Sequence, residues 1–179
     1  MAKKLSGTQT EKNLWAAFAG ESQARNKYEY FAKEFKKAGY EQIAAIFKET
    51  ADNEKEHAKR EFKFLVELGD LKAHLQAAID GEHFEHTKMY PEFAKAAENE
   101  GFPAIAKVFR DIGEAEVAHE KRYKKLLKRI EDKTMFKENK PTKWKCRNCG
   151  YIHEGVTPPG ACPACAHKQA YFERLCENY

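Results

Sequence analysis

The sequence predicts a mainly α-helical protein: an antiparallel four-helix bundle over residues 1–131, a polar linker over 132–143 and a small cysteine-containing module over 144–179. The first stretch contains only two prolines up to residue 131, and its apolar residues recur at helical spacing. All five cysteines of the 179-residue chain come after residue 145, where glycine and proline also gather. An internal repeat joins the two halves of the helical part.

Local signals indicate where the helices begin and end. Thr8-Gln9-Thr10-Glu11 has the spacing of a capping box, which predicts a helix start, and Gly39 is expected to end that helix. Pro103 suits the first turn of the last helix. The expected helices are 8–39, 40–68, 81–99 and 103–131, with an optional short helix over 71–79. Long helices joined by short connections predict an antiparallel bundle.

The repeat becomes visible when the sequence is shifted by 62 residues. The matching pairs are Tyr28 and Tyr90, Phe31 and Phe93, Gly39 and Gly101, Phe47 and Phe109, Glu54 and Glu116, and His57 and His119. A single duplication of this length predicts two related helix hairpins rather than a solenoid.

The repeated motif Glu-x-x-His has the chemistry of a metal ligand pair. A carboxylate and an imidazole three residues apart project from the same face of a helix. One copy alone is typical of a charged helix surface, but two copies at matching positions favour a metal site. Carboxylates on the other two helices complete the pattern of a di-iron protein: Glu21, within an apolar stretch, and Glu82 with Glu85.

A second metal site is predicted by two Cys-x-x-Cys pairs, Cys146 with Cys149 and Cys162 with Cys165. Four thiolates suit zinc or iron, and the spacing does not choose between the two metals. Cys176 has no such partner and is interpreted as an ordinary thiol. The remaining histidines are interpreted as structural or solvated residues rather than ligands: His74, His83, His86, His153 and His167.

Charge and hydropathy exclude several classes of partner. The net charge is only +4, with both signs interleaved, which indicates no nucleic-acid partner. No apolar run reaches the ~18–20 residues of a membrane span, and no apolar stretch follows the first lysines as in a signal peptide. We therefore expect a cytoplasmic protein without membrane association.

The order of the motifs resembles the rubrerythrin family over nearly the whole chain. The segments that carry the resemblance are Ala19-Gly20-Glu21-Ser22-Gln23-Ala24-Arg25-Asn26-Lys27-Tyr28, Glu54-x-x-His57, Gly81-Glu82-His83-Phe84-Glu85 with Met89-Tyr90-Pro91, and Glu116-x-x-His119. Cys-x-x-Cys-Gly-Tyr followed by Cys-Pro-x-Cys resembles rubredoxin. The resemblance implies a ferritin-like bundle with one di-iron centre and a rubredoxin-like module with one Fe(Cys)4 centre per chain.

The same resemblance implies roles for individual residues. The implied iron ligands are Glu21, Glu54, Glu82, Glu85, Glu116 and His119. His57 is implied to replace Glu85 when the site is reduced, an exchange that keeps the charge of a buried, hydroxide-bridged site balanced. Tyr28 and Tyr90 match tyrosines beside the iron ligands, although packing as bundle-core aromatics would also account for them.

The implied activity is reduction of hydrogen peroxide to water as a defence against oxidative stress. Electrons would pass from NAD(P)H through a separate reductase or rubredoxin-type carrier to the Fe(Cys)4 centre and then to the di-iron site, in a homodimer. The chain has no Gly-x-Gly-x-x-Gly nicotinamide motif of its own. Two alternatives stay open: a ferroxidase or iron-handling ferritin-like protein, and a zinc-ribbon interaction protein.

Overall fold

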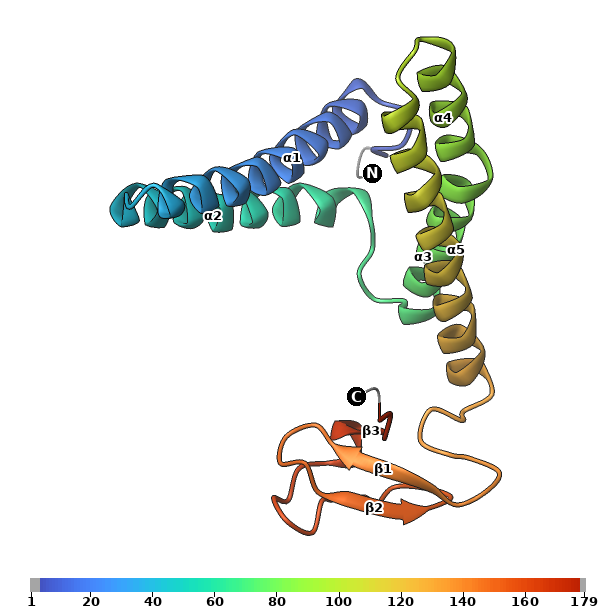
Figure 1. Ribbon diagram of the computed structural model, residues 1–179. Helices are drawn as coiled ribbons and strands as arrows, with labels where there is room; N and C mark the ends of the chain where they lie inside the picture. The colour runs from blue at the N-terminus through green and yellow to red at the C-terminus, as the bar shows by residue number, and fades with distance from the viewer. Residues whose placement is uncertain (1–3, 178–179) are drawn as a thin grey trace. The chain divides into compact units, whose positions relative to one another are not determined.

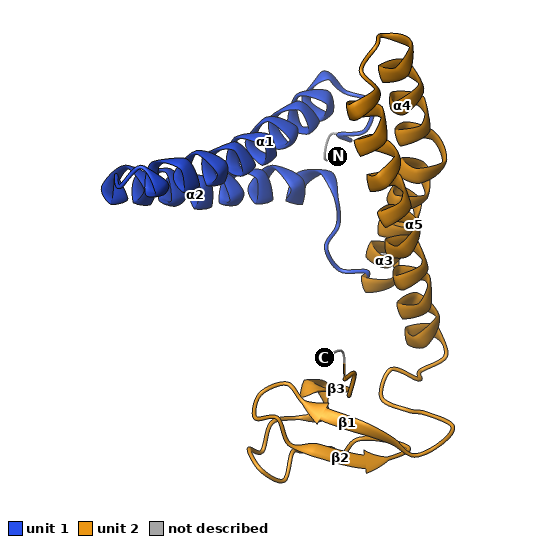
Figure 2. Ribbon diagram, in the orientation of Figure 1, with its two compact units in different colours: residues 1–70 blue, residues 71–179 orange. Residues whose placement is uncertain are grey.

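The computed structural model describes residues 4–177 and divides the chain into two compact units, one ending at Asp70 and the other beginning at Leu71 (Figure 2). Each unit contains one helix hairpin. In the first unit, α1 (Gln9–Lys37) packs against α2 (Glu41–Leu65) (Figure 1). In the second unit, α3 (Leu71–Phe84), the π-helical turn η1 (Glu85–Met89) and α4 (Tyr90–Asn99) pack against α5 (Pro103–Glu131). None of the helices in residues 4–177 combines the length and apolarity that crossing a membrane requires.

The first hairpin begins and turns where the sequence predicts. Thr8 caps α1 by accepting the backbone N–H of Glu11 at 3.1 Å, while the Glu11 carboxylate accepts the N–H of Gly7 at 2.6 Å. Gly39 has φ +85°, the left-handed conformation in which glycine is favoured. The predicted end of α2 is wrong by three residues, because Val66 is already extended, with φ −133° and ψ 131°.

The third helical segment differs from the prediction. Instead of beginning at Gly81, the helix begins at Leu71 and runs through Gly81 to Phe84, after which η1 leads directly into α4. Ile79 is only 5% exposed, so its packing holds the helix across a glycine that costs about 1 kcal/mol relative to alanine. The last helix runs from Pro103 to Glu131 as predicted.

Each hairpin has a buried seam along its second long helix. The buried residues of α2 and α5 recur every seven positions, the spacing at which a helix presents one narrow stripe to its neighbour. The seams are Ala44, Ala51 and Ala58 in α2, and Ala106, Gly113 and Glu120 in α5. The two seams are related by the 62-residue repeat, position by position.

The C-terminal module is a three-stranded antiparallel sheet in the order β2-β1-β3. The strands are β1 (Thr142–Cys146), β2 (Ile152–Gly155) and β3 (Phe172–Arg174), with a short 3-10 helix η2 (Gln169–Tyr171) before β3. Its core contains Trp144, Cys146, Cys162 and Phe172. The Trp144 indole N–H donates to the Gly155 carbonyl at 2.9 Å, which satisfies the polar atom of a side chain that is almost fully buried.

Candidate metal centres

The first hairpin brings together three of the predicted ligands. The Nδ1 atom of His57 lies 2.8 Å from Oε2 of Glu54 on the same helix and 3.7 Å from Oε1 of Glu21 on α1. The ligand atoms of these three residues all lie within 4.8 Å of one another. One carboxylate from α1 therefore meets the Glu-x-x-His pair of α2, as the sequence predicts.

The second hairpin contains a matching cluster. The Nδ1 atom of His119 lies 2.6 Å from Oε2 of Glu116 and 3.5 Å from Oε2 of Glu82 on α3. These three ligand atoms also lie within 4.8 Å of one another. Both hairpins thus present two carboxylates and one imidazole with nearly the same distances. We call these two clusters the half-sites.

The half-sites correct the register of the repeat. Glu82 occupies the place of Glu21, although the offset between them is 61 residues, whereas Tyr28 and Tyr90 are 62 apart. The extra residue lies in η1, because a π-helical turn accommodates one residue more than an α-helical turn. The π turn therefore keeps both Glu82 and Tyr90 in positions equivalent to those of the first hairpin.

Electrostatics within each half-site favours a bound cation. Partial burial, together with a hydrogen bond to Glu54 and the charge of Glu54, raises the pKa of Glu21. Burial and the neighbouring Glu116 raise the pKa of Glu82 in the same way. Two carboxylates that share a half-buried space repel one another, and a metal ion removes that repulsion. The donor set of carboxylates and imidazole fits iron.

The other predicted bundle residues are Glu85, Tyr28 and Tyr90. Glu85 is half-buried on η1 and lies outside the cluster of Glu82, Glu116 and His119. The Tyr28 ring packs 5.8 Å from the ring of Phe47. Burial, followed by the charges of Glu85 and the half-site carboxylates, raises the pKa of Tyr90, so its phenol is a neutral hydrogen-bond donor at neutral pH.

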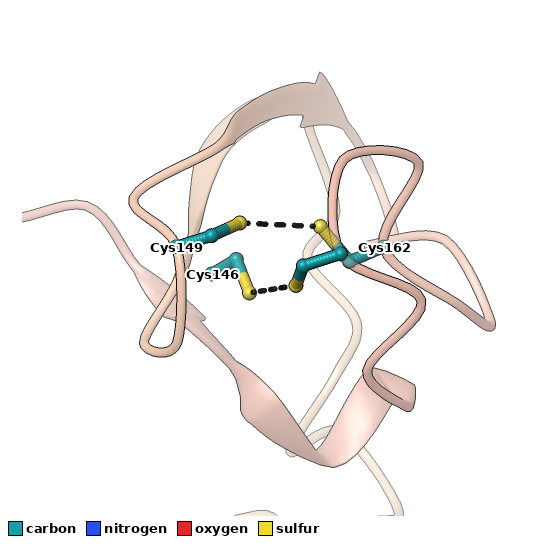
Figure 3. A group of neighbouring side chains, drawn as sticks. Cys146, Cys149 and Cys162 are labelled. Atoms are coloured by element: carbon teal, nitrogen blue, oxygen red, sulfur yellow. Dashed lines mark hydrogen bonds between the residues drawn. The ribbon is translucent and has the colours of Figure 1, made fainter.

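The four cysteines converge at one point of the C-terminal module. Sγ of Cys149 lies 3.6 Å from Sγ of Cys162, and Sγ of Cys146 lies 3.8 Å from Sγ of Cys165 (Figure 3). A tetrahedron with metal–sulfur bonds of about 2.3 Å has edges of about 3.8 Å. The cysteines therefore have the spacing of a four-thiolate metal site.

Two similar loops, which we call the knuckles, supply these cysteines. The backbone N–H of Tyr151 hydrogen-bonds to Cys149, and that of His167 to Cys165. The His167 N–H lowers the pKa of the Cys165 thiol to about 6, which favours the thiolate, whereas hydrogen bonds among the cysteines and burial raise the pKa of Cys149 to about 12. Nδ1 of His167 lies 3.1 Å from the Cys165 carbonyl oxygen, and His167 is not part of the four-cysteine cluster. Cys176 is exposed and also lies outside the cluster.

A third cluster was missed by the sequence analysis. His83 and His86, interpreted there as structural or solvated, both contact Glu120, and Lys124 donates to the same carboxylate at 2.6 Å. Hydrogen bonds from Lys124 and then His86 lower the pKa of Glu120 to about 2. The repeat contained a signal for this cluster, because Glu120 stands where the first half has Ala58.

Comparison with known proteins shows the family to which the chain belongs. The rubrerythrin family model matches residues 12–127, and the model of the rubredoxin-like domain of rubrerythrin matches residues 144–173. Rubrerythrin-1 of Clostridium acetobutylicum is 53% identical, with 99% of this chain and 100% of that protein covered. Rubrerythrin of Nitratidesulfovibrio vulgaris is 51% identical with the same coverage. A solved structure of nigerythrin is 32% identical over 97% of this chain and 90% of that chain, with a TM-score of 0.35.

The family domains imply the metals that fit the two kinds of site. The rubrerythrin domain implies a di-iron centre in a ferritin-like bundle, and the rubredoxin-like domain implies an Fe(Cys)4 centre. The carboxylate and histidine clusters and the four converging cysteines have the donor atoms for both. From the matches over its whole length, the chain belongs to the rubrerythrin family of iron-containing oxidoreductases.

Proposed function

We propose that this protein is a peroxidase that reduces hydrogen peroxide to water. The observation that carries the proposal is the presence of two matching half-sites and a four-thiolate site in one chain. Breaking the O–O bond of hydrogen peroxide to give two water molecules consumes two electrons and two protons. Iron bound by the half-sites would supply the two electrons, and the cysteine module would receive replacements singly from a donor.

The proposed iron ligands are the two half-sites together with Glu85. Glu54 and Glu116 are mostly buried, with 17% and 12% of their side chains exposed, which suits ligands that stay in place. His57 is 60% exposed, against 41% for His119. The greater exposure of the His57 side chain supports a role for His57 as a ligand used only in the reduced state, in exchange for Glu85.

Tyr28 and Tyr90 are proposed to orient the bound peroxide rather than to bind iron. Tyr90 follows η1 directly, and burial together with the negative charges of Glu85 and Glu116 raises the pKa of its hydroxyl. A neutral phenol can donate a hydrogen bond to a peroxide oxygen. Tyr28 holds the equivalent position in the first hairpin, as the 62-residue offset predicts.

A homodimer is part of this proposal, and the connection between α2 and α3 supports it. Leu65 follows Glu54 by 11 residues and Leu71 precedes Glu82 by 11 residues, each about 16 Å of helix at 1.5 Å per residue. A ferritin-like bundle has one long crossover connection, which here would join α2 to α3 as parallel helices. With Glu54 and Glu82 side by side at a shared metal centre, Leu65 and Leu71 would lie about 33 Å apart, at opposite ends of the bundle. The five residues between them reach only about 21 Å. Half-sites from two chains would remove this conflict.

Lengthening that connection tests the dimer. Insertion of about 12 Gly and Ser residues between Leu68 and Gly69 supplies the missing reach. We expect light scattering to give a dimer for the unmodified protein and an increased fraction of iron-containing monomer for the insertion variant. An unmodified monomer with a full complement of bundle iron would contradict this arrangement.

The peroxidase proposal is tested by separating electron entry from peroxide reduction. The variant Cys146→Ser/Cys149→Ser removes two thiolates, and Cys176→Ser is the matched control because Cys176 is exposed and outside the cluster. After chemical reduction, the double variant should consume about one hydrogen peroxide per chain, from the two electrons stored in the bundle, and the control up to about 1.5, because its cysteine-bound iron stores one electron more. In an assay coupled to NADH and a reductase, only the double variant should lose turnover, by about 100-fold or more.

Three outcomes would overturn parts of the proposal. If the reduced, iron-loaded protein consumes no peroxide, the peroxidase function is wrong. If coupled turnover of Cys146→Ser/Cys149→Ser stays near that of the control, electrons enter the bundle directly and the module has another role. Zinc rather than iron in the cysteine site of protein produced with ample iron would favour the zinc-ribbon alternative.

A further inference from the structure

Glu120 is an unusual residue for its position. Within residues 4–177 it is the one charged residue that is buried, with 7% of its surface exposed. Its equivalent in the first hairpin is the buried Ala58, so helix packing at this seam position does not require a carboxylate. Burial of a carboxylate is costly unless cations or hydrogen-bond donors surround it. The residues that contact Glu120 therefore indicate what the carboxylate does.

Two imidazoles from the neighbouring helical segments meet this carboxylate. Nδ1 of His83 on α3 lies 3.0 Å from Oε1 of Glu120, and Nε2 of His86 on η1 lies 3.0 Å from Oε2. All three ligand atoms lie within 4.8 Å of one another. The two histidines are three residues apart and share a helix face, and both segments pack against α5 (Figure 1).

We propose that His83, His86 and Glu120 form a separate binding site for a divalent transition-metal ion such as zinc or ferrous iron. Two imidazole nitrogens and one carboxylate oxygen are a donor set that both ions accept. In a tetrahedral site with bonds of about 2.1 Å, neighbouring ligand atoms lie about 3.4 Å apart. The 3.0 Å contact between Nε2 of His86 and Oε2 of Glu120 needs to lengthen only slightly to admit the ion, and one ligand atom from each of the three residues already lies within 4.8 Å of the others. A water molecule completes the coordination.

The surroundings of the cluster suit such a site. His83 is 58% exposed, so an ion can reach the cluster from solvent. Lys124 Nζ lies 2.6 Å from Oε1 of Glu120, and it can hold one carboxylate oxygen while the metal takes the other. The cluster shares no residue with either half-site or with the cysteine site. Metal binding here is therefore independent of the peroxidase proposal.

The alternative is that the imidazoles only donate hydrogen bonds to Glu120 and tie α3 to α5. A titration of the full-length protein, with its iron sites already filled, separates the two possibilities. Zn²⁺ binding is measured by calorimetry, and Co²⁺ is used as a second probe because its visible spectrum reports nitrogen and oxygen coordination. We expect one further saturable equivalent of Zn²⁺ per chain.

Three variants assign that equivalent to the cluster. His83→Gln, at an exposed position, should weaken Zn²⁺ binding about 10-fold or more, and His83→Gln/His86→Gln about 100-fold or more. His74→Gln, on the same helix α3 and outside the cluster, is the matched control and should bind like the unchanged protein. Circular dichroism and iron content verify that each variant is folded.

The readout needs no peroxidase activity. Absence of an additional saturable equivalent from the unchanged protein would overturn the site, and so would equal Zn²⁺ affinity in the control and in the folded His83→Gln variant. Either result would leave Glu120 as a hydrogen-bonded link between helices.

Discussion

Each hairpin has its own seam, and the two seams match except at the third position. The first two places hold small residues in both hairpins: Ala44 and Ala51 in α2, Ala106 and Gly113 in α5. At the third place, Ala58 in one hairpin corresponds to Glu120 in the other, and one turn later Phe62 corresponds to Lys124. Helix approach explains the small residues. The polar pair has no such explanation, so it indicates a separate chemical role.

The hairpins also differ in backbone while preserving the same half-site geometry. The distances from the imidazole to its two carboxylates are 2.8 and 3.7 Å in one and 2.6 and 3.5 Å in the other. The second hairpin reaches this geometry with one additional residue, taken up by η1. Glu85, the carboxylate without an equivalent in the first half-site, lies at the start of that turn. The comparison shows that the π turn accommodates one additional residue while the half-site distances stay nearly the same.

The largest expected difference between the two half-sites is in the iron content after one imidazole is removed. His119→Ala should lose both bundle irons and keep the cysteine-bound iron, falling from about three irons per chain to about one. His57→Ala should keep about three in the oxidised protein, because Glu85 is the proposed ligand in that state. Iron analysis of both proteins, purified under air, measures this difference.

The same two variants can also contradict the proposed difference between the half-sites. Equal iron loss in His57→Ala and His119→Ala would mean that the half-sites are chemically equivalent and that His57 is a permanent ligand. The exchange between Glu85 and His57 would then be wrong, whereas the peroxidase proposal would stand.

Aromatic packing is expected to give the next largest difference. Phe47 lies 5.3 Å from the ring of Phe35 and 5.8 Å from those of Tyr28 and Phe31. Within residues 4–177, its equivalent Phe109 has two aromatic ring contacts, with Tyr90 and Phe93. Each aromatic pair contributes about 0.5–1.5 kcal/mol beyond buried area. Phe47→Ala should therefore lower the free energy of unfolding by about 1 kcal/mol more than Phe109→Ala. Urea unfolding followed by circular dichroism compares them, and an equal or reversed loss would contradict this ranking.

Features set by local chemistry were predictable from the sequence. The Thr8 cap, the Gly39 turn and the Pro103 start act over a few residues, so the structure reproduces them. The cysteine spacing likewise defines a four-thiolate cluster, because a knuckle is built within one short loop. The half-site carboxylates could be predicted from the sequence because the Glu-x-x-His motif is duplicated.

Features set by contacts between helices were not predictable. Gly81 gives a local signal for a helix start, but packing of Ile79 overrides it. A uniform 62-residue shift aligns Glu21 with His83, and only the π turn reveals that Glu82 is the equivalent residue. The contact of His83 and His86 with Glu120 joins residues more than 30 positions apart. No spacing rule within one helix indicates such a contact.

The two knuckles extend the comparison to a smaller effect. Gly150 and Ala166 occupy equivalent places, each donating its N–H to the carbonyl of the first cysteine of its pair at 2.9 Å. Both have positive φ, 79° for Gly150 and 58° for Ala166, and the left-handed conformation costs an alanine about 1 kcal/mol. Ala166→Gly should raise the stability of the module by up to about 1 kcal/mol. Thermal unfolding of the iron-loaded protein measures it, and destabilisation would show that Ala166 packs favourably enough to offset its strain.

The smallest expected effect concerns the second seam position, where Ala51 corresponds to Gly113. A Cβ atom at residue 113 would lie 3.4 Å from Cβ of Tyr90, an ordinary contact distance, and its backbone has no positive φ. Glycine within a helix costs about 0.5–1 kcal/mol relative to alanine. Gly113→Ala should therefore stabilise the second hairpin by about 0.5 kcal/mol, as measured by urea unfolding beside the Ala51→Gly variant, which should lose at least as much. Destabilisation by Gly113→Ala would mean that Tyr90 needs the space, and that the two hairpins differ at this seam position for the sake of the tyrosine beside the half-site.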